Sequence, residues 1–197
     1  PSAPGARERD LISLARPFIG APYSRTSLEL LANGSFRDYY RERGFWGAAF
    51  ERPAGSTTNG CNGVTASIPV NEGPAYRWAG ARWSGVARFT PEELERVLDM
   101  RRGSVADATK IEAGLAAVKA VYEKQGFVQQ THAMSPELDL ATREATFLIV
   151  VSEGQQYRMG TFTYEGIPAG DGDDLTRRWR LAAGEVFDGS YVRTFMT

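Results

Sequence analysis

The sequence predicts an α+β fold made of tandem β-α-α-β-β modules, each with a three-stranded mixed sheet and two antiparallel helices on one face. The first observation behind this prediction is an internal repeat with a period of about 81–83 residues. The second is a pair of helical patterns inside the one complete period, and the third is a strand pattern before and after those helices. The period exceeds that of solenoid repeats, so each module is predicted to be a small domain.

The repeat is clearest at two places in the chain. Residues 70–85 read VNEGPAYRWAGARWSG and residues 151–166 read VSEGQQYRMGTFTYEG, with six identities at an offset of 81. Residues 39–45, YYRERGF, resemble residues 121–127, VYEKQGF, at an offset of 82. The same order of motifs therefore recurs along the chain.

The repeat predicts three modules. Residues 1–74 form a first module whose first strand is missing or atypical, and residues 75–155 form a complete one. Residues 156–197 form the truncated start of a further module. We therefore expect the chain to be a fragment of a longer polypeptide.

The first half of the complete module contains a strand and two helices. Tyr76–Val86 is rich in aromatic and small residues and is predicted to be a strand. Thr90 is an N-cap, Pro91 suits the first helical position, and Glu93 completes a capping box. Asp107–Gln125 has apolar residues at steps of three and four, which predicts a second helix.

The second half of the complete module contains a strand pair. Phe127–Met134 is predicted to be a strand, Pro136–Asp139 a turn, and Glu144–Val151 the most buried strand. A short turn makes this pair antiparallel, whereas the first strand returns through the helices, so the sheet is mixed. The apolar Glu144–Val151 should be central and the more polar Phe127–Met134 should lie at an edge.

The other two modules follow the same order. Leu11–Phe18 and Thr26–Arg43 are predicted helices of the first module, and Phe45–Arg52 and Val64–Val70 are its strands. Tyr157–Glu165 is predicted to be the first strand of the last module.

Composition excludes several classes of function. Lys+Arg total 23 and Asp+Glu total 24, a net charge of -1, which argues against a nucleic-acid binder with a basic face. One histidine and one cysteine exclude multi-histidine zinc sites, intrachain disulfides and thiolate clusters. Cys61 has no identifiable base partner, and no nucleophile-elbow or phosphate-loop motif occurs. We expect no catalytic residue, metal site or cofactor, and hence no enzyme.

Three short motifs carry a family resemblance. Gly20-Ala21-Pro22-Tyr23 precedes a helix, and Tyr-x-x-x-Gly-Phe ends a helix at Tyr40–Phe45 and Tyr122–Phe127. Glu-Gly junctions lead through Tyr-Arg to a glycine, from Glu72 to Gly85 and from Glu153 to Gly166. In order and spacing, these motifs resemble the POTRA (polypeptide-transport-associated) domains of the BamA-type outer-membrane protein assembly, or bacterial surface antigen, family.

The resemblance implies a location and a set of partners. It places such modules in the periplasm, on the N-terminal side of a membrane β-barrel that would lie outside this fragment and tether it to the outer membrane. It implies binding of unfolded or nascent outer-membrane proteins and of accessory assembly subunits. Within the family, modules of a two-partner secretion transporter are an alternative. A structural or divisome interaction protein is an alternative of another class.

Edge strands give the predicted mechanism of client binding. An edge exposes unpaired backbone N–H and C=O groups, and an added client strand can pair with them with little sequence selectivity. We expect the two polar edges to bind clients in this way. Their residues are Phe45, Trp46, Gly47, Ala48, Ala49, Phe50, Phe127, Val128, Gln129, Gln130, Thr131 and His132.

The Glu-Gly motifs are predicted to be turns between modules that set the angle between them. Glycine supplies backbone freedom there, and the arginines are expected to pair with nearby carboxylates. The predicted junction residues are Glu72, Gly73, Tyr76, Arg77, Glu153, Gly154, Tyr157 and Arg158.

Overall fold

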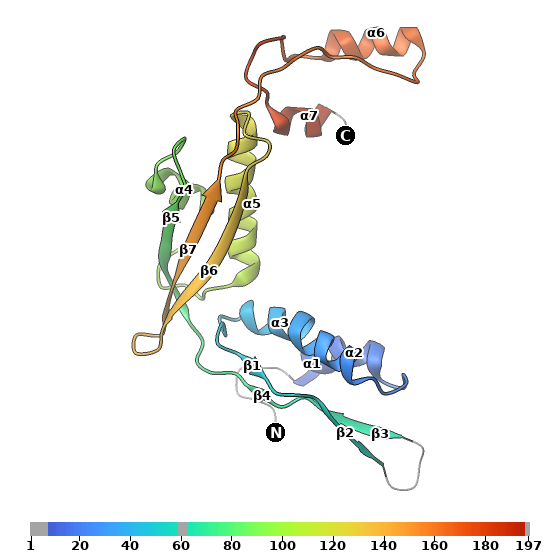
Figure 1. Ribbon diagram of the computed structural model, residues 1–197, viewed down its shortest axis with the longest axis vertical. Helices are drawn as coiled ribbons and strands as arrows, with labels where there is room; N and C mark the ends of the chain where they lie inside the picture. The colour runs from blue at the N-terminus through green and yellow to red at the C-terminus, as the bar shows by residue number, and fades with distance from the viewer. Residues whose placement is uncertain (1–7, 59–62, 196–197) are drawn as a thin grey trace. The chain divides into compact units, whose positions relative to one another are not determined.

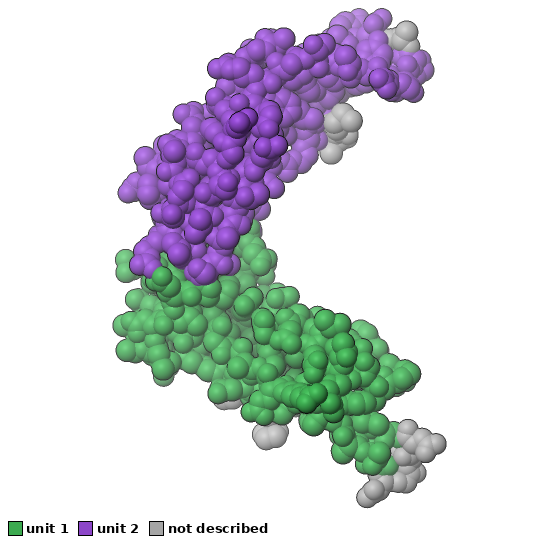
Figure 2. All heavy atoms as spheres, viewed as in Figure 1, with its two compact units in different colours: residues 1–80, 100–112, 136–147 green, residues 81–99, 113–135, 148–197 purple. Residues whose placement is uncertain are grey.

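The computed structural model describes residues 8–58 and 63–195, so Cys61 lies outside the described residues. The chain divides into two compact units, which Figure 2 colours separately. One unit holds Pro1–Gly80, Met100–Glu112 and Pro136–Phe147, and the other holds Ala81–Asp99, Ala113–Ser135 and Leu148–Thr197. The module boundaries given above stay a prediction.

A three-stranded mixed sheet is the centre of the second repeat (Figure 1). Its strands β5 (Arg77–Ser84), β6 (Thr131–Asp139) and β7 (Glu144–Ser152) lie in the order β5-β7-β6. The prediction that the apolar strand is central is confirmed, because β7 lies between the other two. Alternate side chains of β7 are buried, and these are Ala145, Phe147, Ile149 and Val151.

The two helices of this repeat begin where the sequence predicts. In α4 (Pro91–Leu98) the N-cap hydroxyl of Thr90 accepts from Glu93 N–H, and the Glu93 carboxylate accepts from Thr90 N–H. Ile111, Leu115, Val118 and Tyr122 form the buried stripe of α5 (Ala108–Lys124).

The first repeat has the same helices, with one extra residue between the start of its long helical run and the motif tyrosine. α1 (Glu8–Ala15) and the 3-10 turn η1 (Arg16–Phe18) precede a helical run of α2 (Arg25–Leu31), η2 (Ala32–Phe36) and α3 (Arg37–Arg41). η2 is a π-helix. α2 and α5 begin 83 residues apart, but Tyr40 in α3 and Tyr122 in α5 are 82 apart. The π-helical turn takes up the inserted residue, as such bulges do.

The strands of the first repeat are shorter than predicted. β1 (Ala49–Phe50) pairs with β4 (Val70–Asn71), and β2 (Ala54–Thr57) pairs with β3 (Val64–Ser67), both antiparallel. The buried Pro53 separates β1 from β2. Proline has no N–H for a ladder, so Pro53 interrupts the pairing on one side, and Phe45 N–H is bonded back to Tyr40 O on the other. The predicted strand Phe45–Arg52 is reduced to two residues.

The predicted edge strand of the second repeat is displaced along the chain. Phe127–Gln130 form a turn, β6 begins at Thr131, and the predicted turn Pro136–Asp139 is strand. The hairpin turns instead after Asp139, whose carboxylate accepts from the N–H groups of Ala141 and Thr142 at 2.8 and 3.1 Å. These backbone bonds lower the pKa of Asp139.

The last repeat has helices α6 (Ala169–Arg178) and α7 (Gly189–Phe195) but lacks its predicted strand. Within the described residues, Tyr157–Glu165 makes one isolated bridge, Arg158 to Val186. A strand needs a ladder of such pairs, and no described segment supplies the rest.

Candidate functional site

The Tyr-x-x-x-Gly-Phe motif closes a helix in the first repeat. Gly44 has φ 85°, Gly44 N–H donates to Arg41 O at 3.1 Å, and Phe45 N–H donates to Tyr40 O at 2.9 Å. These two bonds define a Schellman motif, which leaves the residue after the cap outside any strand. The rings of Tyr40 and Phe45 meet edge to face at 5.9 Å. The motif therefore encodes a helix end and its hydrophobic contact.

The same cap recurs in the second repeat. Gly126 has φ 83°, its N–H donates to Glu123 O at 3.2 Å, and Phe127 N–H donates to Tyr122 O at 3.0 Å. The rings of Tyr122 and Phe127 lie 6.0 Å apart, edge to face. The cap explains why the predicted edge residues from Phe127 to Gln130 are turn: the backbone of Phe127 is bonded back to its helix.

The glycine of the cap also contacts the residue with which the next repeat begins. Tyr76 N–H donates to Gly44 O at 2.8 Å, and Tyr76 O accepts from Ala106 N–H at 3.1 Å. A Cβ on Gly44 would lie 2.7 Å from Tyr76 O and 3.1 Å from Val105 Cγ1. The peptide groups of Tyr76 thus bond to the first repeat on one side and the second repeat on the other, and only glycine fits at the contact.

The second junction repeats these contacts residue by residue. Tyr157 N–H donates to Gly126 O at 2.9 Å, and Tyr157 O accepts from Phe187 N–H at 3.0 Å. A Cβ on Gly126 would lie 2.6 Å from Tyr157 O and 3.1 Å from Val186 Cγ1. The predicted junction residues are therefore brought together with partners that recur at offsets of 81 and 82.

The junction arginines bind carbonyl groups rather than the carboxylates expected from the sequence. Arg77 Nη1 donates to Gly103 O and Arg158 Nη1 donates to Gly184 O, both at 2.8 Å. Each arginine links the junction segment to the loop before the second helix of the next repeat.

The junction glutamates bind the motif tyrosines. Tyr122 OH donates to Glu153 Oε1 at 2.9 Å, which also accepts from Ala87 N–H and Arg88 N–H at 2.8 and 2.9 Å. Burial opposes ionisation of Glu153, but these donors outweigh it and lower the pKa of its carboxyl. Burial, and then Glu153, raise the pKa of Tyr122, as burial and Glu72 raise that of Tyr40.

The two junctions differ in their additional contacts. At the first, Trp46 Nε1 donates to Ala106 O at 2.6 Å and the Trp46 ring lies 4.9 Å from that of Phe147. At the second, Glu123 forms an ion pair with Arg193. Trp46, expected on a client-binding strand, instead packs inside its junction.

The edge strand β6 is the described part of the chain that best matches the predicted client-binding surface. Thr131, Ala133 and Ser135 are exposed, while His132 and Met134 between them are half-buried. Burial, and then Lys119, lower the pKa of His132. Of the twelve predicted edge residues, Thr131 and His132 lie in β6 and Ala49 and Phe50 in β1. The other eight lie outside the strands.

Sequence reasoning missed the residues that contact each junction segment. Val105 and Val186 contact the capped glycines, and Ala87 and Arg88 supply the amides that bind Glu153. Val105 and Val186 are 81 residues apart, so the repeat offset could have found them. The two amides carry no side-chain signal.

Comparison with known proteins assigns the second repeat to a family. Residues 76–154 match the family described as POTRA, surface antigen variable number repeat. Residues 76–154 are a POTRA domain. The matched stretch begins at the junction residue Tyr76 and ends at Gly154, just after the glutamate that closes the repeat. The resemblance stated from the motifs is thus confirmed.

Relatives and solved structures agree with a POTRA fold. The putative outer membrane protein assembly factor of Treponema pallidum (strain Nichols) is 28% identical over 180 residues, covering 89% of this chain and 21% of that protein. This chain therefore spans about a fifth of that relative's length. POTRA domains 3–5 of Haemophilus influenzae BamA superpose with a TM-score of 0.64 at 23% identity, covering 89% of this chain and 69% of that one.

A second solved structure, BamA of Haemophilus ducreyi lacking POTRA domains 1–3, has a TM-score of 0.54 at 15% identity. It covers 77% of this chain and 28% of that one. The predicted α+β fold with a mixed three-stranded sheet is confirmed. Within residues 8–58 and 63–195, every helix falls short of the length and hydropathy needed to cross a bilayer.

Proposed function

We propose that this chain is a non-catalytic, periplasmic polypeptide-binding part of an outer-membrane protein assembly factor, tethered to that membrane. It would receive unfolded outer-membrane proteins, and accessory assembly subunits, by adding their extended segments to a sheet edge. The name of the Treponema pallidum relative supports the assembly-factor alternative over the two-partner transporter and the divisome protein.

The observation that carries the proposal is the position of β6. It is a nine-residue strand at the edge of its sheet, and no described strand lies on its outer side. Such an edge presents backbone donors and acceptors at regular spacing, which an extended client can pair with. Pairing through the backbone accepts many client sequences, as a general receptor requires.

Pro136 limits where a client can pair. Proline is tolerated inside an edge strand where its nitrogen faces away from the neighbouring strand. Because backbone direction alternates along a strand, the outward groups would be those of His132 and Met134, while Thr131, Ala133 and Ser135 pair with β7. The proposed client edge is therefore Thr131–Ser135, and Pro136 ends it.

The first repeat offers a weaker edge. β1 has two residues and is separated from β2 by Pro53, so a client would meet an interrupted row of backbone groups. Strand addition gains one or two hydrogen bonds there rather than a ladder, so we assign client binding to β6.

A titration monitored by isotope-edited NMR tests this assignment. An unlabelled β-strand peptide from an outer-membrane protein should shift the amides of Thr131–Ser135 in the labelled 197-residue chain. A matched peptide that is N-methylated at alternate residues on its pairing edge keeps its side chains but loses those N–H donors, and it should cause no shift. Unchanged β6 amides at saturating peptide, or equal shifts with both peptides, would refute strand addition at this edge.

A further inference from the structure

At both junctions, the end of one repeat's long helix contacts the start of the second helix of the next repeat. At the first junction, the Thr109 hydroxyl at the start of α5 donates to Glu42 Oε1, just after α3, at 3.4 Å. At the second, Arg193 of α7 forms an ion pair with Glu123 near the end of α5. A helix end and a helix start therefore form a docking surface at each junction.

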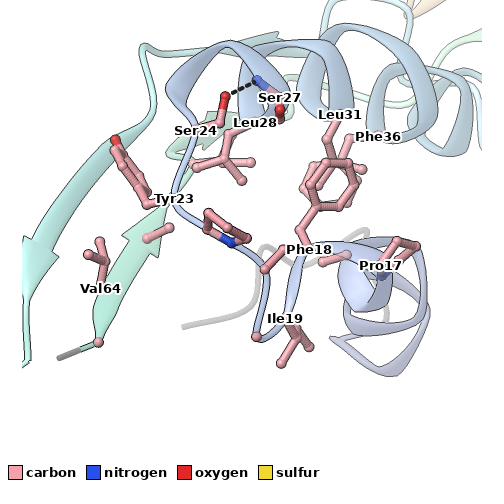
Figure 3. Close-up of a pocket in the computed structure, with 17 residues that line it drawn as sticks. Pro17, Phe18, Ile19, Tyr23, Ser24, Ser27, Leu28, Leu31, Phe36 and Val64 are labelled. Carbon is pink, nitrogen blue, oxygen red and sulfur yellow. Dashed lines mark hydrogen bonds between the residues drawn. The ribbon is translucent and has the colours of Figure 1, made fainter. Parts of the chain in front are cut away.

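An N-cap fixes where this second helix begins in each repeat. In the first repeat, beside the apolar pocket shown in Figure 3, the Ser24 hydroxyl accepts from Ser27 N–H at 3.3 Å. In the second and third repeats, the carboxylates of Asp107 and Asp188 each accept from the N–H two residues on, at 3.0 and 2.9 Å. Asp107 and Asp188 are 81 residues apart, so the helix positions after them can be compared one by one.

The charges at the two docking surfaces are exchanged. At the second junction, the Glu123 side chain is only 12% exposed and pairs with Arg193, the fifth residue of α7. A carboxylate with so little access to water depends on a cationic partner. At offsets of 82 and 81, the equivalent residues of the first junction are Arg41 and Glu112. The acidic residue thus lies on the helix end at one junction and on the helix start at the other.

The space at the two docking surfaces also differs. A Cβ on Gly189, the first residue of α7, would lie 2.9 Å from Val128 Cγ1. At the first junction, the equivalent residues are the larger Ala108 and Trp46. The Trp46 indole donates to a backbone carbonyl of the second repeat, and the guanidinium of Arg41 lies 5.2 Å from the centre of its ring. Each helix end therefore fits the helix start that follows it in the chain.

We infer that these docking surfaces specify the order of the repeats. The helix end with Glu123 and Val128 fits a helix start that has glycine at its first position and arginine at its fifth. A start like that of the second repeat would bring Glu112 toward Glu123 and the Cβ of Ala108 toward Val128. A start like that of the third would bring an arginine toward Arg41. Such mismatches disfavour the wrong neighbour, which matters in a chain whose repeats share one fold.

A charge exchange in the 197-residue chain tests the polarity. Tyr157 N–H donates to Gly126 O across the second junction, so its hydrogen exchange reports docking. Arg193→Glu gives α7 the charge of the second repeat and should speed this exchange at least about tenfold, which is about 1.4 kcal/mol. Glu123→Arg alone should do the same. The two changes together reproduce the polarity of the first junction and should recover most of the lost protection.

Two controls separate docking from folding. Met159 N–H donates to Glu185 O inside the third repeat at 2.7 Å, and its exchange should stay at the parent rate in all three variants. Arg180→Glu makes the same charge change on an exposed residue that takes part in none of the ion pairs among residues 8–58 and 63–195. It should leave Tyr157 at the parent rate. Equal effects of Arg180→Glu and Arg193→Glu, or a double variant no better protected than the single ones, would overturn the proposal.

Gly189→Ala tests the fit of the surfaces. Alanine is the better helix former, so without a close contact this change would stabilise α7. We expect faster exchange at Tyr157 instead, because the new Cβ meets Val128 Cγ1. Val128→Ala removes that atom, so in its background Gly189→Ala should no longer speed the exchange. Slower exchange at Tyr157 on Gly189→Ala in the parent chain would overturn the steric part of the proposal.

One combined variant carries both docking residues of the second repeat. Gly189→Ala with Arg193→Glu should protect Tyr157 less than either change alone, while Met159 keeps its protection. Circular dichroism checks that the variant folds. Parent-like protection of Tyr157 in this variant would show that the junction accepts either helix start, and the proposal would be overturned.

Discussion

Gly126→Ala should detach the third repeat from the helix cap of the second. The new Cβ would lie 2.6 Å from Tyr157 O and 3.1 Å from Val186 Cγ1. The closer atom belongs to the backbone, so relief requires the junction segment around Tyr157 to move. Tyr157 donates to Gly126 O and accepts from Phe187 N–H, and both bonds should lengthen together.

Gly103→Ala is the matched control for the magnitude. Gly103 has φ 79°, close to the 83° of Gly126, but a Cβ there meets nothing within 4 Å. Left-handed strain alone costs about 1–2 kcal/mol, which is the loss expected for Gly103→Ala. Gly126→Ala adds crowding of about 1–3 kcal/mol, so we expect a total loss of about 2–5 kcal/mol.

Two measurements separate strain from the loss of docking. Urea unfolding followed by tryptophan fluorescence gives the total loss for each variant. Hydrogen exchange at the Tyr157 and Phe187 amides reports the junction itself, and both should exchange faster in Gly126→Ala but not in Gly103→Ala. Equal destabilisation by the two substitutions, with unchanged exchange at Tyr157, would refute the assigned role of the glycine.

Three further changes test other parts of the structure. Glu153→Gln should destabilise the chain by about 1–2 kcal/mol at pH 7. The pKa of Glu153 is lowered on folding, so the deficit is complete above the ordinary pKa of a glutamate. It vanishes as the pH falls through the lowered value, and a deficit that persists in acid would contradict this. Trp46→Phe should cost about 1–2 kcal/mol by leaving Ala106 O without its donor, as measured by urea unfolding. An unchanged midpoint would argue that the hydrogen bond contributes nothing. Deletion of Gly34 should convert η2 to α-helix with little loss of melting temperature, whereas deletion of Lys119 from α5 should rotate Tyr122 by about 100° and unfold its repeat. Similar melting temperatures for the two deletions would contradict the insertion argument.

Local sequence signals predicted the helices and the central strand well. Thr90 and Glu93 form the capping box that the sequence predicts, and α5 has its buried stripe where the apolar spacing places it. β7 lies between β5 and β6, and its alternate apolar residues are buried, as its composition predicts. Each of these features depends on residues that are near one another in the sequence.

The edge strand was misplaced because two local signals compete there. Phe127–Gln130 has the composition of a strand, but Gly126 closes a Schellman motif that bonds Phe127 back to Tyr122. Pro136 suggests a turn, yet an edge strand tolerates proline, and Asp139 closes the hairpin instead. Whether a proline ends a strand depends on which side of the strand is paired. That depends on residues far away in the sequence.

The junction residues were recognised, but their partners were not. The repeat singles out Tyr76 and Arg77, whereas their hydrogen bonds go to the backbone of Gly44, Gly103 and Ala106. A backbone carbonyl can belong to any residue type, so no composition or spacing marks it. This is also why the arginines were expected to pair with carboxylates.

The two edges of the central strand β7 in the second repeat have different neighbours. In the second repeat, one edge of β7 pairs with the junction strand β5, and the other pairs with β6, which forms the outer edge of the sheet. The first edge lies against a loop with a positive-φ glycine and an apolar face, so it selects a segment with arginine and a large apolar side chain. The outer edge, β6, has exposed small and polar residues on one face, so under the proposed function it would select clients by backbone alone. A selective edge suits a fixed neighbour in the same polypeptide, and an unselective edge suits varied clients. Pro136 fits this division in the second repeat, because it lies in β6 while β5 and β7 contain no proline.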